Sequence, residues 1–282
     1  MDICIIIPAH NEEAFISKTL DSLCNQTLLP KRIIVVNDNS TDHTEEIVNN
    51  YSLQHKFVHL VNSQSSEAHI PGSKVINAFY KGLAALQEDY DILCKFDADL
   101  IFPLHYLEQI VSHFTSHPKA GMVGGFCYIE KNQKWELENL TNKDHIRGAL
   151  KAYRKSCFEQ IGGLKKSMGW DTADELIAQY HEWDILTDET LHVKHLKPTG
   201  NSYNKTSKYK QGEAFYKLRY GLILTCIASL KLAFLKGKPL YFIDYIVGYF
   251  KAFFRKESQL VSKPEGKFIR KLRWKKIKQK VL

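Results

Sequence analysis

Short apolar runs alternate with amphipathic segments through the first hundred residues, and this alternation constrains the fold more than any other feature. The segments between the runs have helical periodicity. Continuous β-branched runs are typical of strands that are buried on both faces. We therefore expect an α/β fold with a mainly parallel central sheet and helices on both faces. The predicted strands cover residues 3–7, 33–36, 58–61 and 91–96.

Polar clusters follow three of these strands directly. Pro8–Glu12 comes after the first strand, Asp38 after the second, and Asp97 and Asp99 after the fourth. Ligands of open parallel sheets bind at the carboxyl ends of the strands. The sequence therefore predicts one polar rim on which these clusters meet.

Asp97 and Asp99 stand two residues apart, so alternation along a strand points both carboxylates the same way. Like charges held that close raise each other's pKa unless a cation lies between them. Oxygen ligands suit Mg²⁺ or Mn²⁺. We predict a site for a divalent metal and a diphosphate, with a capped turn at the end of the strand as the alternative.

Residues 104–204 have a less regular pattern. An irregular polar stretch and an acidic cluster interrupt it, and its last predicted strand carries His192 and His195. We expect a helix over 104–114, a strand over 121–128 and the irregular stretch over 135–145. We expect a strand–helix unit over 147–161, an acidic helix over 171–181 and a last strand over 190–196.

The basic charge is concentrated at the carboxyl end. The whole chain carries a net charge of +8, whereas residues 251–282 alone hold 12 Lys/Arg and two Glu. We therefore divide the chain into a catalytic domain, 1–204, and a helical, basic C-terminal extension, 205–282.

The extension has a composition that suits a membrane surface. Its longest uncharged run, residues 220–230, is too short for a bilayer span, which needs about 20 apolar residues. Aromatic residues and lysines alternate over 232–254, and the tail 267–280 is basic. This favours contact with an anionic membrane surface. The alternatives are a packed helical hairpin with a solvated tail, and a nucleic-acid contact that no recognition motif supports.

Two further features bear on location. The six cysteines are scattered without the spacing of a metal site. The sequence opens directly on a predicted strand, so we expect no signal peptide. Together they predict a cytoplasmic protein, or one held at the inner face of the membrane.

Four motifs, taken in order, resemble the family 2 glycosyltransferases. They are Ile5–Glu13, Val35–Asp42, Phe96–Asp99, and Gly162-Gly163 followed by the acidic cluster Asp171–Glu175. The resemblance covers about residues 1–200. It implies the GT-A fold, a nucleotide-diphospho-sugar donor, a divalent metal cofactor (Mn²⁺ or Mg²⁺) and inversion at the anomeric carbon.

The resemblance also implies roles for individual residues. The donor would lie against the first, second and fourth strands, the metal at the fourth, and the general base in the acidic cluster. Pro8, Ala9 and Glu12 would line the nucleoside pocket, and Asp38 would accept a hydrogen bond from the nucleobase. Asp97 would hold the ribose and the metal, and Asp99 would hold the metal. Asp171 would be the general base, with Asp174 as its rival. A late histidine often completes the metal site in related folds, and His195 is preferred to His192 because it ends its strand.

Alternative roles remain for these residues. Asp171 or Thr172 could instead cap the acidic helix, with Asp174 in its first turn. A histidine near a strand is more often part of a structural hydrogen bond than a metal ligand.

The sequence departs from the family pattern at four places. Trp170-Asp171, with Asp174-Glu175 three residues on, replaces the usual Glu-Asp pair, which leaves the identity of the base open between Asp171 and Asp174. Asn37-Asp38-Asn39-Ser40 replaces Asp-Asp-Gly-Ser but retains the second Asp. Ala78-Phe79-Tyr80 replaces Ala-Arg-Asn, which leaves Lys74 as the candidate phosphate contact. The Gln-x-x-Arg-Trp signature of processive synthases is absent from the sequence. This favours an enzyme that adds a single sugar.

These features predict an inverting glycosyltransferase that moves one sugar from a nucleotide-sugar, UDP-linked by preference, to a glycan or lipid-linked acceptor in cell-surface polysaccharide synthesis. One alternative is a nucleotidyltransferase that activates a sugar phosphate. Its Gly-rich phosphate loop is not found in Pro8–Glu13. Another is a non-catalytic nucleotide-sugar-binding membrane scaffold, against which the retained aspartates argue.

Overall fold

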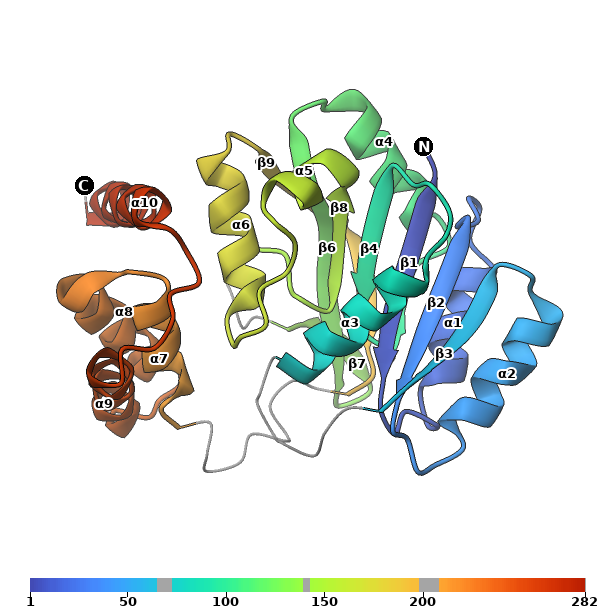
Figure 1. Ribbon diagram of the computed structural model, residues 1–282, viewed down its shortest axis with the longest axis horizontal. Helices are drawn as coiled ribbons and strands as arrows, with labels where there is room; N and C mark the ends of the chain where they lie inside the picture. Colours follow the sequence, from blue (N-terminus) through green and yellow to red (C-terminus); the bar gives the residue numbers. More distant parts are fainter. Residues whose placement is uncertain (65–72, 139–142, 198–207, 282) are drawn as a thin grey trace.

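The computed structural model describes residues 1–64, 73–138, 143–197 and 208–281 (Figure 1). Within these ranges, nine strands form a single sheet, and ten helices surround or extend it. The strands are β1 Ile3–Ala9, β2 Arg32–Asp38, β3 Val58–Ser63, β4 Ile92–Phe96, β5 Leu100–Ile101, β6 Ala120–Lys131, β7 Lys134–Leu137, β8 Leu150–Arg154 and β9 Asp184–His195. The helices are α1 Ile16–Cys24, α2 Thr44–Gln54, α3 Ser73–Ala85, α4 Tyr106–Ser116, α5 Lys155–Gln160, α6 Trp170–Tyr180, α7 Lys210–Lys217, α8 Gly221–Leu235, α9 Leu240–Phe254 and α10 Lys263–Val281.

The amino-terminal half of the sheet is parallel, as expected. The order is β3-β2-β1-β4-β8-β6-β9-β5, and β1 pairs in parallel with both β2 and β4. The chain therefore builds outward from β1 to β3 and then returns to the other side of β1. Helix α3 crosses the face of the sheet opposite to α1 (Figure 1). Such a reversal opens a crevice at the carboxyl ends of β1 and β4.

The core explains why these runs became strands. Ile5, Ile6 and Ile7 of β1 have no exposed surface, and most of β2 and β4 is equally buried. Apolar faces of α1 and α3 cover the two sides of this sheet. The prediction of an α/β fold with helices on both faces is confirmed.

Beyond β4 the sheet becomes mixed. Strand β8 runs antiparallel to both β4 and β6, whereas β9 is parallel to β6. Strand β9 is longer than predicted and also pairs with the two-residue β5, which sets Leu100 opposite His195. The irregular stretch expected over 135–145 begins instead with β7, which forms a hairpin with β6.

The carboxyl-terminal extension is helical, as predicted. Helices α7, α8 and α9 pack together, away from β1–β3, and α10 returns to α6 (Figure 1). The rings of Tyr180 in α6 and Phe268 in α10 have centroids 5.7 Å apart, and Ile269 is fully buried. The predicted boundary at 204/205 lies outside the described residues. In the described part of the chain, no helix combines the length and apolarity that a membrane crossing requires.

Candidate active site

The first two polar clusters of the predicted rim are tied together by hydrogen bonds. The backbone N–H of Glu12 donates to Oγ1 of Thr44 at 2.8 Å, and that of Thr41 donates to Oδ1 of Asn11 at the same distance. His10 donates from Nδ1 to the carbonyl of Asp38 at 2.6 Å. The two loops therefore form one wall at the carboxyl ends of β1 and β2, which the parallel register predicts.

The turn that carries Asp97 and Asp99 is held by its neighbours on both sides. The Thr19 hydroxyl donates to the Ala98 carbonyl at 2.7 Å and accepts from Leu100 N–H at 3.0 Å. The Asp97 N–H donates to the carbonyl of Ala149 at 2.8 Å. A side chain of α1 and the backbone residue just before β8 thus hold this turn in place.

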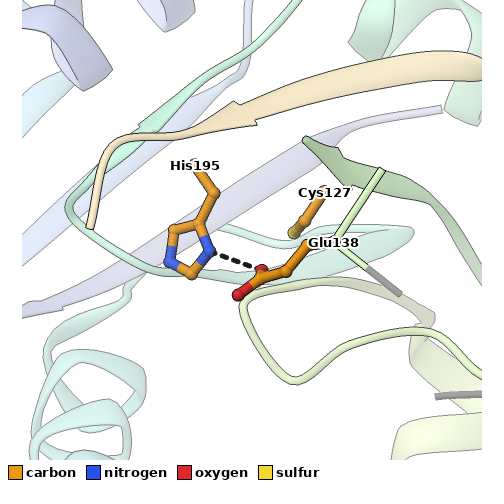
Figure 2. Close-up of side chains that lie close together, drawn as sticks. All are labelled: Cys127, Glu138 and His195. Carbon is orange, nitrogen blue, oxygen red and sulfur yellow. Dashed lines mark hydrogen bonds and ion pairs between the residues drawn. The ribbon is translucent and has the colours of Figure 1, made fainter. Parts of the chain in front are cut away.

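Asp99 faces His195 across the β5–β9 pair. The distance from Asp99 Oδ2 to His195 Nε2 is 3.4 Å, and both side chains are less than one-tenth exposed. On its other side, His195 donates from Nδ1 to Oε2 of Glu138 at 2.9 Å (Figure 2). Arg147 forms an ion pair with the same carboxylate. A histidine whose Nδ1 is held by a carboxylate presents Nε2 as a ligand, which is the usual arrangement at metal sites.

Cys127 completes a close group with Glu138 and His195. One ligand atom from each lies within 4.8 Å of the others (Figure 2). Burial raises the pKa of the Cys127 thiol to about 12. The thiol is therefore neutral and a weak ligand, and Glu138 and Nδ1 of His195 are engaged with each other. This group is better suited to orient His195 than to hold a metal by itself.

Asp97 has a different environment from Asp99. Its carboxylate, about one-third exposed, forms an ion pair with Lys95, whose side chain is almost fully buried. Lys95 also donates to the Gly148 carbonyl at 3.0 Å. The two aspartates were expected to need a cation between them. The structure supplies Lys95 beside one and the His195 ring beside the other.

Glu12 joins this acidic group from β1. Burial raises its pKa, and repulsion by Asp99 and Asp97 adds to the rise, although Lys197 opposes it. Lys197 contacts Oε1 at 2.8 Å, whereas Oε2 is buried and has no hydrogen-bond partner among the described residues. Three carboxylates therefore meet at the rim, and one of them has an oxygen free for a ligand.

The acceptor-side candidates lie on α6, where Asp171 is the more open. About one-third of its side chain is exposed, and its Oδ2 lies 3.8 Å from Nε2 of His145. Burial raises the pKa of Asp171, but His145 and Lys151 outweigh that effect and lower the pKa to about 2. Gly148 allows the start of α6 to lie close to the backbone before β8, because a Cβ at Gly148 would lie 2.7 Å from the Trp170 ring. Asp171 is ionised at neutral pH and reaches solvent.

Asp174, the rival candidate, is fully buried. Both of its oxygens accept hydrogen bonds from Lys151, at 2.8 and 3.0 Å, and Oδ2 also accepts from the Tyr153 hydroxyl at 2.6 Å. Glu175 is 3.1 Å from the same ammonium. The structure thus separates the two aspartates, which the sequence left together, into an open Asp171 and an enclosed Asp174.

The remaining predicted residues lie at different distances from this centre. His192 is on the exposed face of β9, where its ring centroid lies 4.2 Å from that of Tyr128 with the rings tilted, and Nε2 bonds to the Glu189 carbonyl at 2.9 Å. Lys74 is half-buried in the first turn of α3, directly after residues outside the described ranges. Pro8 and Ala9 end β1, and Ala9 is buried.

Sequence reasoning missed the roles of Lys95, Lys151, His145 and Glu138. Lys95 had a signal, since it lies two residues before Asp97 in an otherwise apolar strand and so shares its face. Lys151 also lies in a short buried strand. A lysine within such a strand needs a buried partner, and this could have pointed to the acidic cluster.

Relatives of known sequence agree on one type of enzyme. The probable glycosyltransferase YdaM of Bacillus subtilis (strain 168) is 29% identical over 208 residues, 65% of this chain and 46% of that protein. A poly-β-1,6-N-acetyl-D-glucosamine synthase of Staphylococcus epidermidis is 28% identical over 167 residues, 58% of this chain and 35% of that protein. The chain thus spans about half or less of the length of these two relatives.

Solved structures share the fold. The mannosyltransferase PcManGT from Pyrobaculum calidifontis, in complex with GDP-Man and Mn²⁺, matches with a TM-score of 0.59 and 17% identity, covering 95% of this chain and 78% of that one. A fragment of S. aureus TarS in complex with UDP-GlcNAc matches with a TM-score of 0.55 and 18% identity, covering 89% and 73%. The predicted GT-A fold is confirmed.

The family assignment rests on the profile of glycosyl transferase family 2, which matches residues 4–164, more than half of the chain. That range contains the first two rim clusters and the turn with Asp97 and Asp99. The chain belongs to glycosyltransferase family 2.

Proposed function

We propose that this chain is a metal-dependent, inverting glycosyltransferase that adds a single sugar from a nucleotide-sugar to a glycan or lipid-linked acceptor. The observation that carries the proposal is the separation of two carboxylate centres, one at the rim of the sheet and one on α6. Asp99 lies with His195 at the donor rim. Asp171 lies open on α6, with its backbone carbonyl bound to Lys151 of β8. In-line displacement needs such a division, with one centre for the leaving group and another for the acceptor.

The residues at the rim suit Mn²⁺ or Mg²⁺. Asp99 and the Nε2 atom of His195 are the proposed ligands, with Asp97 shared between the metal and the ribose. The support is the Glu138 carboxylate, which holds Nδ1 of His195 and so directs Nε2 toward Asp99. A bound divalent ion stabilises negative charge on the diphosphate leaving group.

The donor is proposed to lie along the wall formed by the β1 and β2 loops. Pro8, Ala9 and Glu12 would line the nucleoside, and Asp38 would accept from the base, which favours uracil. The free Oε2 of Glu12 supports a polar ligand at this point. Lys74 is the proposed phosphate contact, because it lies in the first turn of α3, the helix that follows β3 in the chain. Structural neighbours in complex with UDP-GlcNAc and GDP-Man are consistent with a nucleotide-sugar.

Asp171 is the proposed general base. Its carboxylate would accept the proton of the acceptor hydroxyl while the new bond to the anomeric carbon forms and the bond to the diphosphate breaks. A carboxylate with a pKa near 2 is a weak base, but it is ionised throughout the physiological range. Asp174 is proposed as a positioning residue that fixes Lys151 and thereby α6.

The acceptor is proposed to belong to cell-envelope polysaccharide synthesis at the inner face of the membrane. The relative that makes poly-β-1,6-N-acetyl-D-glucosamine supports the product class. The basic extension supports the location, because its cations suit an anionic leaflet.

Incubation of the chain with UDP-sugars and Mn²⁺, with release of UDP as the readout, tests the proposal. Slow hydrolysis of one UDP-sugar is expected, with loss of the activity in Asp99→Asn. Chelation with EDTA should abolish the reaction, and added Mn²⁺ should restore it. If calorimetry detects no binding of any nucleotide diphosphate in the presence of Mn²⁺ or Mg²⁺, the proposal is wrong.

A further inference from the structure

Helices α8 and α9 place their largest apolar side chains on the outside. Phe234 is 86% exposed, Phe254 75% and Leu240 71%. On α8 the exposed residues Ile223, Ile227, Leu230 and Phe234 recur at helical spacing and so form one stripe. A soluble monomer rarely leaves so large a contiguous apolar surface in water.

The buried sides of the same helices carry mostly small or polar residues, beside one large residue each, Leu224 and Tyr245. Thr225 and Ser229 of α8 are fully buried, and Gly248 and Ala252 of α9 are nearly so. A surface helix of a soluble protein has the opposite arrangement, with its apolar stripe toward the core. Small residues spaced by four at the contacts, with large apolar residues outside, are typical of helices packed within lipid.

Helices α7 and α9 approach each other closely, in the same manner. A Cβ atom added to Gly212 of α7 would lie 1.7 Å from the carbonyl oxygen of Tyr245. One added to Gly248 of α9 would lie 2.0 Å from the carbonyl oxygen of Tyr209. The two backbones are therefore in direct contact through glycine, so this packing depends on close backbone contact rather than on large interlocking side chains.

Basic residues surround the exposed stripe. Residues 220–256 contain six Lys/Arg and one acidic residue, Asp244. Asp244 is buried and forms an ion pair with Lys208 at 3.0 Å, so it does not offset the exposed cations. On α9, Lys251 and Arg255 are exposed and directly follow the exposed Phe250 and Phe254. Cations next to an apolar face match the phosphate and acyl layers of an anionic membrane.

We propose that the α8–α9 hairpin, residues 221–254, lies in the interface of an anionic phospholipid bilayer and embeds its exposed apolar face in one leaflet. Each helix has 15 residues and is about 22 Å long. A second copy of the chain is a poorer occupant of this face, because a two-fold contact would bring the surrounding cations of both copies together. Lipid carries the complementary negative charge.

This surface has a fixed relation to the acceptor side. Helix α10 leaves the hairpin and packs on α6, with Lys276 bound to Asp144 at 2.5 Å as well as the Tyr180–Phe268 contact. Helix α6 carries Asp171. The hairpin is therefore joined through α10 to the helix that carries the proposed base, which suits a lipid-linked acceptor. This last step rests on the proposed function, whereas the membrane contact does not.

Flotation of the full chain with vesicles tests the contact. Vesicles of phosphatidylcholine alone are compared with vesicles that contain about 30% phosphatidylglycerol. We expect binding to the anionic vesicles and a drop of about tenfold or more in partitioning for the double variant Phe234→Asp/Phe254→Asp. Leu53→Asp is the matched control, because Leu53 is equally exposed, at 85%, but lies on α2. It should bind as the wild type does.

Three results would overturn the proposal. The wild type could remain unbound with both vesicle types, or the double variant could float as well as the wild type. Light scattering could also reveal a dimer that the double variant dissociates, without any binding to vesicles, which would assign the face to a second copy. Thermal melting checks that both variants fold. Hydrolysis of UDP-sugar in buffer is measured separately, so a failure of one proposal does not imply failure of the other.

Discussion

Lys95 and Lys151 lie directly opposite each other in the antiparallel β4–β8 ladder, yet the two ammonium groups belong to different ion pairs. Lys95 holds Asp97 at the donor rim, whereas Lys151 holds Asp174 and the start of α6. Their ammonium nitrogens lie 5.5 and 5.8 Å from the ring centroid of Trp170. One cross-strand pair thus connects the proposed donor and acceptor centres.

Substitution of Lys151 tests its role in the stability of the fold. Lys151→Met leaves the buried Asp174 without its cation and leaves Glu175 with His145 alone. We expect a loss of roughly 3–5 kcal/mol in the free energy of unfolding, measured with urea. The double variant Lys151→Met/Asp174→Asn should recover part of this loss, because it removes the unpaired charge of Asp174. A single variant as stable as the wild type would contradict the buried ion pair.

Substitution of Lys95 should act on the donor instead. Lys95→Met removes the cation beside Asp97 but keeps the length and apolar stem of the side chain. We expect KM for the nucleotide-sugar to rise about tenfold or more while kcat changes less, since a charged hydrogen bond contributes about 1.5–3 kcal/mol. Steady-state kinetics measure the two constants. An unchanged KM would mean that Lys95 does not position Asp97 for the donor.

The two histidines of β9 provide a matched test of the metal site. His195→Ala removes the ring beside Asp99, whereas His192→Ala removes a ring that lies on the exposed face. The Mn²⁺ concentration for half-maximal activity should rise at least tenfold in the first variant and remain unchanged in the second. Glu138→Gln should weaken metal activation by about 10–100-fold, because Glu138 orients His195. Equal effects of the two histidine variants would remove His195 from the metal site.

The parallel half of the fold could be predicted because its signals are local. Each of β1 to β4 is an apolar run that ends in polar residues, and parallel pairing then brings those ends to one rim. Strand β7 was missed because Lys134–Leu137 is short and half-exposed, with no apolar run. A strand of this kind forms only because the β6 hairpin pairs with it.

The candidate site was predictable only in part, since its decisive contacts join distant residues. Asp99 and His195 meet because β5 pairs with β9, and no local pattern specifies that register. Asp171 and Asp174 differ in environment because Lys151, about twenty residues earlier, binds the carboxylate of Asp174 but only the backbone carbonyl of Asp171. The sequence identified the acidic cluster, but only the structure showed that Asp171 is partly exposed and Asp174 is buried.

Matched substitutions of the two aspartates test that division. Asp171→Asn should lower kcat by about 100-fold or more and leave UDP binding close to wild type, and it should lower stability less than Asp174→Asn does, because the side chain is partly exposed. Asp174→Asn should instead lower stability by roughly 2–4 kcal/mol, because it leaves the buried Lys151 with less negative charge. Calorimetry of UDP binding and urea denaturation provide the two readouts. The reverse pattern would make Asp174 the base.

The His145–Asp171 pair predicts a pH window for stability. His145 contacts Glu175 at 2.8 Å and Asp171 at 3.8 Å, and Lys151 faces the same carboxylates. Burial lowers the pKa of His145, but the two carboxylates outweigh it and raise the pKa to about 9 from 6.5. Its contribution to stability is therefore complete below pH 6.5 and is lost as the pH rises through 9.

Asp171 determines the lower pH limit of the range in which this pair stabilises the fold. Its pKa is lowered from 3.8 to about 2, so its contribution is complete above pH 3.8 and is lost as the pH falls through 2. The difference in unfolding free energy between wild type and His145→Gln should thus be largest between about pH 4 and 6.5 and should shrink toward pH 9. Urea denaturation at a series of pH values measures it. A difference that stays constant up to pH 9 would mean that folding does not raise the pKa of His145.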